Sequence, residues 1–259
     1  MKQNTLFLFL LLIVFNVRVD AQSFHAQYIE ISESAQESRL NPTILHLFFN
    51  SEKSIFYQEE TSDQFYASEE KDAMGLPEDV QVSLGSEAQW LLKDMQAKQL
   101  KELLNDFKSN KIIIKDEVHP MKWKLEAESK KIGPFTAQKA TTFFRGRTYE
   151  AWYTLEIPIP NGPWKMGGLP GLVIEFIDSE KIFGLRLIKI ENIEDQWNID
   201  TPNQKEYKEI SPEEYNQLYF KQLDEFFKFK EAQLRSTGKD IKISYKRENY
   251  ELIEIFEDQ

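Results

Sequence analysis

Apolar and polar residues alternate along most of the chain, and this period of two predicts β-strands with one buried face. Branched or aromatic residues recur between turn signals in 43–50, 54–58, 111–115, 122–128, 137–144, 148–157, 172–177 and 182–190. The first two of these segments are expected to pair as a hairpin across the polar residues 50–53. Short loops join antiparallel strands, because parallel pairing needs a long crossover, and a sheet of so many strands curls or closes. The pattern therefore predicts a mainly β fold built on a curved antiparallel sheet, bowl- or barrel-like.

Two segments change to the helical period of three and four. The first runs over 86–109 and carries the apolar stripe Ala88, Leu91, Leu92, Met95, Leu100, Leu103, Leu104 and Phe107. The second runs over 211–235, opens with Ser211 and Pro212, and carries the stripe Tyr215, Leu218, Tyr219, Leu223, Phe226 and Phe227. Stripes of this kind are typical of core packing rather than of cofactor sites. We therefore expect two amphipathic helices packed on the sheet, which makes the fold class α+β.

The N-terminus has the organisation of a signal peptide. Lys2 precedes the apolar run Leu6–Val14, and Val19-Asp20-Ala21 matches the small-x-small cleavage pattern, so cleavage is expected before Gln22. The run is shorter than the ~20 residues that span a bilayer. The sequence therefore predicts a signal peptide over 1–21, one β-rich domain over 22–259, no transmembrane segment after cleavage, and export to the periplasm or the cell surface.

Composition narrows the chemistry that this domain can use. There are no cysteines, which excludes disulfides, a thiol nucleophile and a lipid-modified cysteine after the signal. The formal net charge of −11 argues against nucleic acid and against anionic membrane surfaces as partners. Acidity of this size keeps an exported protein in solution, although an acidic recognition face is the alternative reading.

The most distinctive motif lies within Lys139–Asp178. Its features are Gln138-Lys139-Ala140, Arg145-Gly146-Arg147, Ala151-Trp152-Tyr153-Thr154, Gly162-Pro163-Trp164 and Gly168-Leu169-Pro170-Gly171-Leu172-Val173. Together with Asn249-Tyr250-Glu251-Leu252 near the C-terminus, they resemble the GLPGLI family of exported proteins from Bacteroidetes-type bacteria. Ala137 stands where that family often has a cysteine, so thiol chemistry does not carry over. The family is one of unknown function, so the resemblance implies export but no activity.

The Gly-Leu-Pro-Gly-Leu stretch, Gly168 to Leu172, is expected to be a structural motif. Pro170 fixes φ at the first central position of a type II turn, and Gly171 supplies a positive φ at the second. The alternative is a glycine-lined anion nest, but no Lys-Ser/Thr pair follows the glycines and a strand follows instead of a helix. The sequence therefore predicts a turn in which Gly171 tolerates no side chain.

One strand offers a candidate ligand face. In 148–157, Tyr149, Ala151, Tyr153, Leu155 and Ile157 share the expected core face, whereas Thr148, Glu150, Trp152, Thr154 and Glu156 share the polar face. A polar face with one large aromatic suits a wet, concave ligand surface, and a solvated face has the same pattern. We assign Arg145, Arg147, Trp152 and Trp164 as candidate ligand-binding residues.

An ion pair is expected beside this face. If Asp178-Ser179-Glu180-Lys181 forms a two-residue hairpin loop with Asp178 opposite Lys181, Glu175 and Arg186 lie diagonally on one face of adjacent strands. Unpaired charges among apolar neighbours would be costly, which favours an arginine–carboxylate pair. The alternative is that each charge is solvated.

No catalytic constellation is evident. His25, His46 and His119 lie far apart without metal-ligand spacing, and there is no Gly-x-Ser-x-Gly elbow. We therefore predict no catalytic residues, no metal and no cofactor, and a non-enzymatic binding or envelope-accessory role with an unknown ligand or envelope partner. The alternative is a hydrolase with paired carboxylates across a cleft, because 43 acidic residues always provide some pairs. A purely structural role in a surface complex also stays open.

Overall fold

The structure is a computed structural model that describes residues 22–32, 43–58, 64–67, 80–83, 89–118, 121–193, 197–200 and 207–236. The predicted signal peptide 1–21, His119 and the motif at 249–252 lie outside the described residues.

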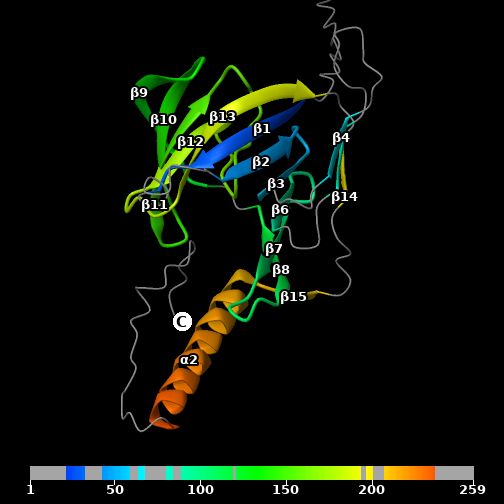
Figure 1. Ribbon diagram of the computed structural model, residues 1–259. Helices are drawn as coiled ribbons and strands as arrows, with labels where there is room; N and C mark the ends of the chain where they lie inside the picture. Colours follow the sequence, from blue (N-terminus) through cyan, green and yellow to red (C-terminus); the bar gives the residue numbers. More distant parts are fainter. Residues whose placement is uncertain are drawn as a thin grey trace, which may run out of the picture.

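One 12-stranded sheet dominates the molecule (Figure 1). Its strands, in spatial order, are β15 (Lys208–Ile210), β8 (Lys111–Glu117), β7 (Gln99–Asn105), β6 (Trp90–Asp94), β3 (Lys53–Gln58), β2 (Ile44–Phe49), β1 (Ser23–Glu30), β13 (Gly184–Ile193), β12 (Leu172–Asp178), β11 (Arg147–Thr154), β10 (Phe135–Phe144) and β9 (Lys124–Ile132). Neighbouring strands are antiparallel except β15 and β8. A smaller sheet contains β14 (Trp197–Asp200), β5 (Val80–Ser83) and β4 (Gln64–Ala67).

The predicted hairpin of β2 and β3 is confirmed. Phe49 pairs with Ser54, and the backbone N–H of Asn50 donates to the carbonyl of Lys53 at 3.0 Å. The Asn50 side chain accepts hydrogen bonds from the N–H groups of Glu52 and Lys53, both at 2.9 Å, so a local polar contact fixes this turn.

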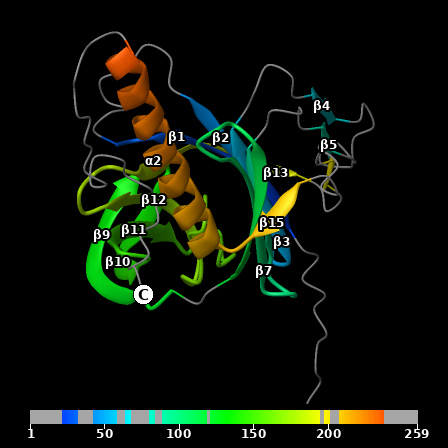
Figure 2. The ribbon, with the colours of Figure 1, turned by 90° about the horizontal axis from the view of Figure 1, so that it is seen from below.

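The large sheet is strongly curved, as expected. Asp116 at the end of β8 forms an ion pair with Arg145 of the β10–β11 turn, with 2.6 Å between the charged atoms, although β8 and β10 lie at nearly opposite ends of the strand order. Figure 2 shows the same curvature, with β9 to β12 on one side and β3 and β7 on the other. The sheet therefore forms a bowl whose concave face carries Asp116.

Each face of the sheet has its own apolar cluster. The larger cluster includes Leu47, Leu91, Leu100, Tyr149 and Phe176 on the concave face and extends to Trp152. Phe48, Ile55, Tyr57, Trp90, Leu103, Ile113, Ile193 and Trp197 form the second cluster on the opposite, outer face. Many strands are therefore buried on both sides, which a simple alternation of apolar and polar residues does not describe.

The helix predicted over 86–109 is wrong, because the described residues of this segment form β6 and β7. Leu91 and Leu100 point to the concave cluster, whereas Trp90 and Leu103 point to the outer one. A strand pair that is buried on both faces has apolar residues at helical as well as alternating spacings, and this produced the false stripe. The turn between the strands contains Lys98 at a φ of 52°, a left-handed conformation.

The second predicted helix is confirmed as α2 (Pro212–Ser236), and it is the helix of the described residues. Ser211 and Glu214 form a capping box: the Glu214 N–H donates to Ser211 Oγ at 3.1 Å, and the Ser211 N–H donates to Glu214 Oε2 at 2.8 Å. The helix packs on the β7–β8 hairpin through Tyr215, whose hydroxyl donates to the Asn105 carbonyl at 2.9 Å. Among the described residues, no helix has the length and apolar character needed to cross a membrane.

Candidate functional site

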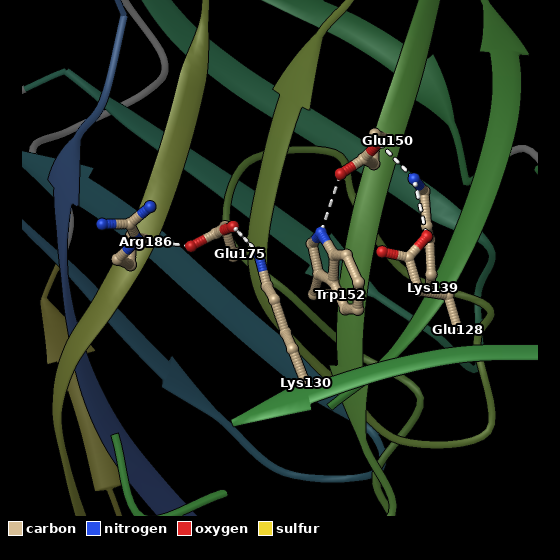
Figure 3. Close-up of polar contacts among 7 residues, drawn as sticks. All are labelled: Glu128, Lys130, Lys139, Glu150, Trp152, Glu175 and Arg186. Atoms are coloured by element: carbon tan, nitrogen blue, oxygen red, sulfur yellow. Dashed lines mark hydrogen bonds and ion pairs between the residues drawn. The ribbon is translucent and has the colours of Figure 1, made fainter. Parts of the chain in front are cut away.

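A row of polar residues crosses four neighbouring strands on the outer face. Lys139 of β10 pairs with Trp152 of β11, Trp152 pairs with Glu175 of β12, and Glu175 pairs with Arg186 of β13. Glu128 and Lys130 of β9 and Glu150 of β11 surround this row, as Figure 3 shows. We call these seven residues the Trp152 face: Glu128, Lys130, Lys139, Glu150, Trp152, Glu175 and Arg186.

Trp152 is the aromatic centre of this face and is only 3% exposed. Its indole N–H donates to Glu150 Oε1 at 2.9 Å, which fixes the plane of the ring. Lys130 covers the ring, with its Nζ 4.0 Å from the ring centroid, and Lys139 Nζ lies 5.7 Å from the same centroid. The indole is thus held between a carboxylate at its edge and an ammonium group on its surface.

Glu175 is buried and connects two cations. It accepts a hydrogen bond from Lys130 Nζ at 2.7 Å and another from Arg186 Nε. The predicted pairing of Glu175 with Arg186 on one face is therefore confirmed, and a third residue, Lys130, joins them.

The predicted register of this hairpin is wrong by two residues. Glu175 lies directly opposite Arg186 rather than diagonal to it, because the loop contains four residues instead of two. The Asp178 carboxylate explains the longer loop: its Oδ1 accepts hydrogen bonds from the N–H groups of Ile182 and Phe183, both at 2.8 Å. An aspartate that bonds its own loop in this way selects the wider turn.

Neighbouring groups of opposite charge keep Glu150 and Lys139 of the Trp152 face ionised. Partial burial raises the pKa of Glu150, but hydrogen bonds from Lys139 and Trp152 and the charges of Lys139 and Lys130 outweigh it, so that the pKa lies below the ordinary value. Hydrogen bonds to Glu150 and Glu128 raise the pKa of Lys139. Glu150 and Lys139, 2.8 Å apart, therefore stay charged over a wide range around neutral pH.

The four candidate ligand-binding residues do not come together in one site. Trp164 lies in the concave core, where its ring packs edge-on against Phe183 with centroids 5.2 Å apart. Arg147 is buried and pairs with Asp178 at 3.3 Å, and Arg145 pairs with Asp116. Of the four, Trp152 is the residue that lies on the outer face.

The concave face is occupied by the motif loop, residues 158–171, which is part of the connection from β11 to β12. Lys93 of β6 is 3% exposed and donates from its Nζ to the carbonyls of Gly162 at 2.7 Å and Met166 at 3.0 Å. Lys165 reaches Glu102 of β7 at 3.1 Å. Two lysines thus fasten the loop to strands on the far side of the bowl.

The predicted type II turn is wrong in its backbone but right in its intolerance of side chains. Gly168, and not Gly171, has the positive φ, at 80°. The Leu172 N–H bonds the Ile157 carbonyl at 3.0 Å. A Cβ on Gly171 would lie 2.0 Å from the Thr154 carbonyl oxygen, so close backbone approach excludes a side chain there.

The sequence pattern did not identify Lys130, which contacts both the Trp152 indole and Glu175. The strand predicted over 122–128 ended too early, whereas β9 continues to Ile132 and places Lys130 beside Trp152. The signal was present in the alternation of charged and small residues through 126–130, which is typical of an edge strand.

The chain matches one known protein family over more than half of its length. Residues 78–216, more than half of the chain, match the family model of the N-glycanase peptide, N-terminal domain. The chain belongs to this family. The matched part runs from β5 into α2 and contains the motif loop and all seven residues of the Trp152 face.

Solved structures of PNGF-II share the fold of this chain. Structures in the C2 and P21 space groups both match with a TM-score of 0.51 and 17% sequence identity over 78% of this chain. The match covers 33% and 34% of the PNGF-II chains, so this chain spans about a third of the length of those proteins. No curated protein matches the chain.

Proposed function

We propose that the chain is an exported, non-enzymatic binding or envelope-accessory protein whose ligand contacts the Trp152 face. The ligand class is the glycan of a glycoprotein, in keeping with a family named for N-glycanases. The observation that carries the proposal is an indole whose N–H is fixed by Glu150, whose ring lies under Lys130, and which is surrounded by charged donors and acceptors. Sugar hydroxyls both donate and accept hydrogen bonds, and the C–H face of a sugar ring packs on an aromatic ring.

Lys130 has to move for a sugar to reach the indole. Its side chain is 38% exposed, and a cation–π contact at such a position contributes only about 0.5–1 kcal/mol. Its ion pair with Glu175 adds a similarly small amount, and Glu175 keeps Arg186 as a partner when Lys130 leaves. Displacing Lys130 therefore costs little compared with the gain from a fitted ligand.

The electrostatics of the carboxyl groups favour binding over hydrolysis. Paired-carboxylate catalysis keeps one carboxyl group protonated as the acid, which requires a raised pKa. The described carboxyl groups with a displaced pKa are Asp106, Glu150, Glu191 and Glu225, and each pKa is lowered. Ionised carboxylates serve as hydrogen-bond acceptors for sugar hydroxyls.

The test is a calorimetric titration of an N-glycosylated peptide into the full chain and two variants. Trp152→Ala should weaken binding at least ~10-fold, because a central aromatic contact is lost. Phe143→Ala is the matched control, since Phe143 is an aromatic residue of β10 that is 71% exposed outside the Trp152 face. Equal affinity of Trp152→Ala and the parent would contradict the proposal, and cleavage of the peptide that Glu150→Gln abolishes would support a hydrolase.

We further propose that the GLPGLI resemblance and the N-glycanase N-terminal domain describe one fold, because the matched residues 78–216 include the whole motif segment 139–178. Export to the periplasm or cell surface is part of the same proposal. Mass spectrometry of the native protein should then find Gln22 as its first residue, and retention of residues 1–21 would refute the signal peptide.

A further inference from the structure

Two histidines that are distant in the sequence meet on the outer face of the sheet. His25 of β1 and His46 of β2 lie on adjacent strands, with His25 Nε2 2.8 Å from His46 Nδ1. The other ring nitrogen of His25, Nδ1, lies 3.0 Å from Oε1 of Glu191 on β13. Both histidines are buried. A chain of three titratable groups therefore joins β13, β1 and β2 in the middle of the 12-stranded sheet.

Aromatic rings hold both imidazoles in place. His25 stacks on Phe48 with ring centroids 4.2 Å apart, and His46 stacks on Tyr57 of β3 with centroids 5.2 Å apart. Phe48 also contacts Trp197 of β14, at 6.2 Å between centroids, so the same stack reaches the smaller sheet. The two imidazoles cannot turn away from each other without disturbing this packing.

The charges on β13 determine which ring nitrogens carry a hydrogen. Partial burial raises the pKa of Glu191, but hydrogen bonds from Lys189 and His25 outweigh it, so the pKa is lowered and the carboxylate is ionised at neutral pH. An ionised carboxylate only accepts hydrogen bonds, so His25 Nδ1 carries the hydrogen. In a neutral His25 the second nitrogen, Nε2, is then an acceptor. The hydrogen between the two rings therefore belongs to His46 Nδ1.

We propose that the histidine pair, His25 and His46, is a pH-sensitive contact that loosens the pairing of β1 with β2 in acid. One added proton leaves the contact intact, because a charged His46 still donates from Nδ1 to His25 Nε2. A second proton places an N–H group on His25 Nε2, directly against the Nδ1–H of His46. Two donors and two positive charges then face each other at a hydrogen-bond distance and repel. The pair holds with one added proton or none and separates with two.

The transition is expected below the ordinary pKa of histidine. Burial lowers the pKa of His25 from 6.5, and the charges of His46 and Lys189 act in the same direction. The hydrogen bond to Glu191 raises the pKa but does not compensate. Unfolded histidines titrate at about 6.5, so below this pH the unfolded chain binds more protons than the folded one. The contribution of the pair to stability is therefore complete above about pH 6.5 and is lost as the pH falls.

Hydrogen exchange of the full chain at about pH 5 and about pH 7.5 tests the proposal. After correction for the intrinsic pH dependence of exchange, the amides of β1 and β2 should be on the order of 10-fold less protected at the lower pH. The β10–β11 hairpin, which β13 and β12 separate from β1, is the internal control and should keep its protection. His46→Asn is the matched variant, since its amide donates in place of Nδ1–H but does not titrate. In this variant the pH-dependent loss should disappear.

Nitrogen NMR spectra of the histidine rings test the same contact in the parent protein, so they decide even where His46→Asn fails to fold. At about pH 8 both His25 and His46 should be Nδ1–H tautomers. A hydrogen on His25 Nε2 at that pH would overturn the proposal. Equal protection of β1 and β2 at both pH values would do the same, and so would an equal loss in the β10–β11 hairpin. A loss confined to β1 and β2 that His46→Asn removes supports it.

Discussion

At the scale of single residues, Gly171 shows how close the motif loop lies to β11. A Cβ there would stand 2.0 Å from the Thr154 carbonyl oxygen, and backbone atoms cannot move away cheaply. Gly171→Ala should therefore lower the free energy of unfolding by about 3 kcal/mol or more, as overpacking does. Gly133→Ala is the control, because its Cβ meets nothing within 4 Å and only its φ of 56° is unfavourable, at about 1 kcal/mol. Urea unfolding of both variants measures the difference, and equal costs would show that the close approach is not required.

The Glu175–Arg186 contact should stabilise the fold measurably. Glu175 is 6% exposed, so its charge is poorly solvated without its partners. A double-mutant cycle of Glu175→Gln and Arg186→Met should give a coupling free energy of about 1 kcal/mol. The Lys108–Glu225 pair is half exposed on both sides and should couple more weakly. A coupling at Glu175–Arg186 no larger than at the exposed pair would mean that the contact contributes nothing to stability.

Lys93 should make stability depend on pH. Burial lowers its pKa to about 7, whereas an unfolded lysine titrates near 10.4. Between these values the unfolded chain binds more protons than the folded one, so the free energy of unfolding should rise with pH. Lys93→Met should rise less steeply between pH 7 and 10, as chemical denaturation at each pH would measure. Lys124→Met, at a side chain that is 81% exposed, is the control. Parallel profiles of Lys93→Met and the parent would show that folding does not lower the pKa of Lys93.

Among individual residues, the sequence predicted those whose partners are local in a hairpin. Glu175 and Arg186 were paired correctly because they lie close in sequence on adjacent strands, even though the Asp178 side chain changed the register. The partners of Lys93 are the carbonyls of a loop some seventy residues away, and no local pattern identifies them. The contact between Lys130 and Trp152 could not be predicted either, because it joins two strands that are separated in sequence.

At the scale of elements, contacts between residues close in sequence made α2 predictable. The prediction for 86–109 was wrong because distant residues bury both faces of this segment. The capping box of Ser211 and Glu214 is a contact within one turn, so it can be identified from sequence. Whether Trp90 and Leu91 belong to one helix stripe or to two faces of a strand depends on which residues cover each face. Those residues come from distant segments, so the local sequence does not identify them.

A substitution in the β6–β7 turn should change the free energy of unfolding in opposite directions for a hairpin and for the helix predicted over 86–109. Lys98 is exposed and adopts a φ of 52°, which glycine adopts without strain. Lys98→Gly should therefore raise the free energy of unfolding by up to about 1 kcal/mol. In a helix the same change would lower it by about 1 kcal/mol. Thermal unfolding decides between them, and Lys98→Ala, which keeps the strain, should give no gain.

At the scale of the whole molecule, the curved mainly β architecture follows from the sequence pattern, but the direction of curvature does not. The ion pair of Asp116 with Arg145 shows that the face with Tyr149 is inside, so the motif loop fills the bowl and Trp152 faces outward. The alternation in β11 separated these two faces correctly. It could not tell which face is concave, because that depends on the order of all 12 strands. Trp164 was therefore grouped with Trp152, although it belongs to the core.

Native mass spectrometry of the full chain mixed with an N-glycosylated peptide tests most directly whether this domain binds glycans without cleaving them. The expected spectrum contains a one-to-one complex whose released peptide has an unchanged mass, and Trp152→Ala should lose that complex while keeping its own folded charge-state distribution. A peptide of altered mass, or the absence of any complex with the parent protein, would contradict a non-enzymatic glycan-binding role.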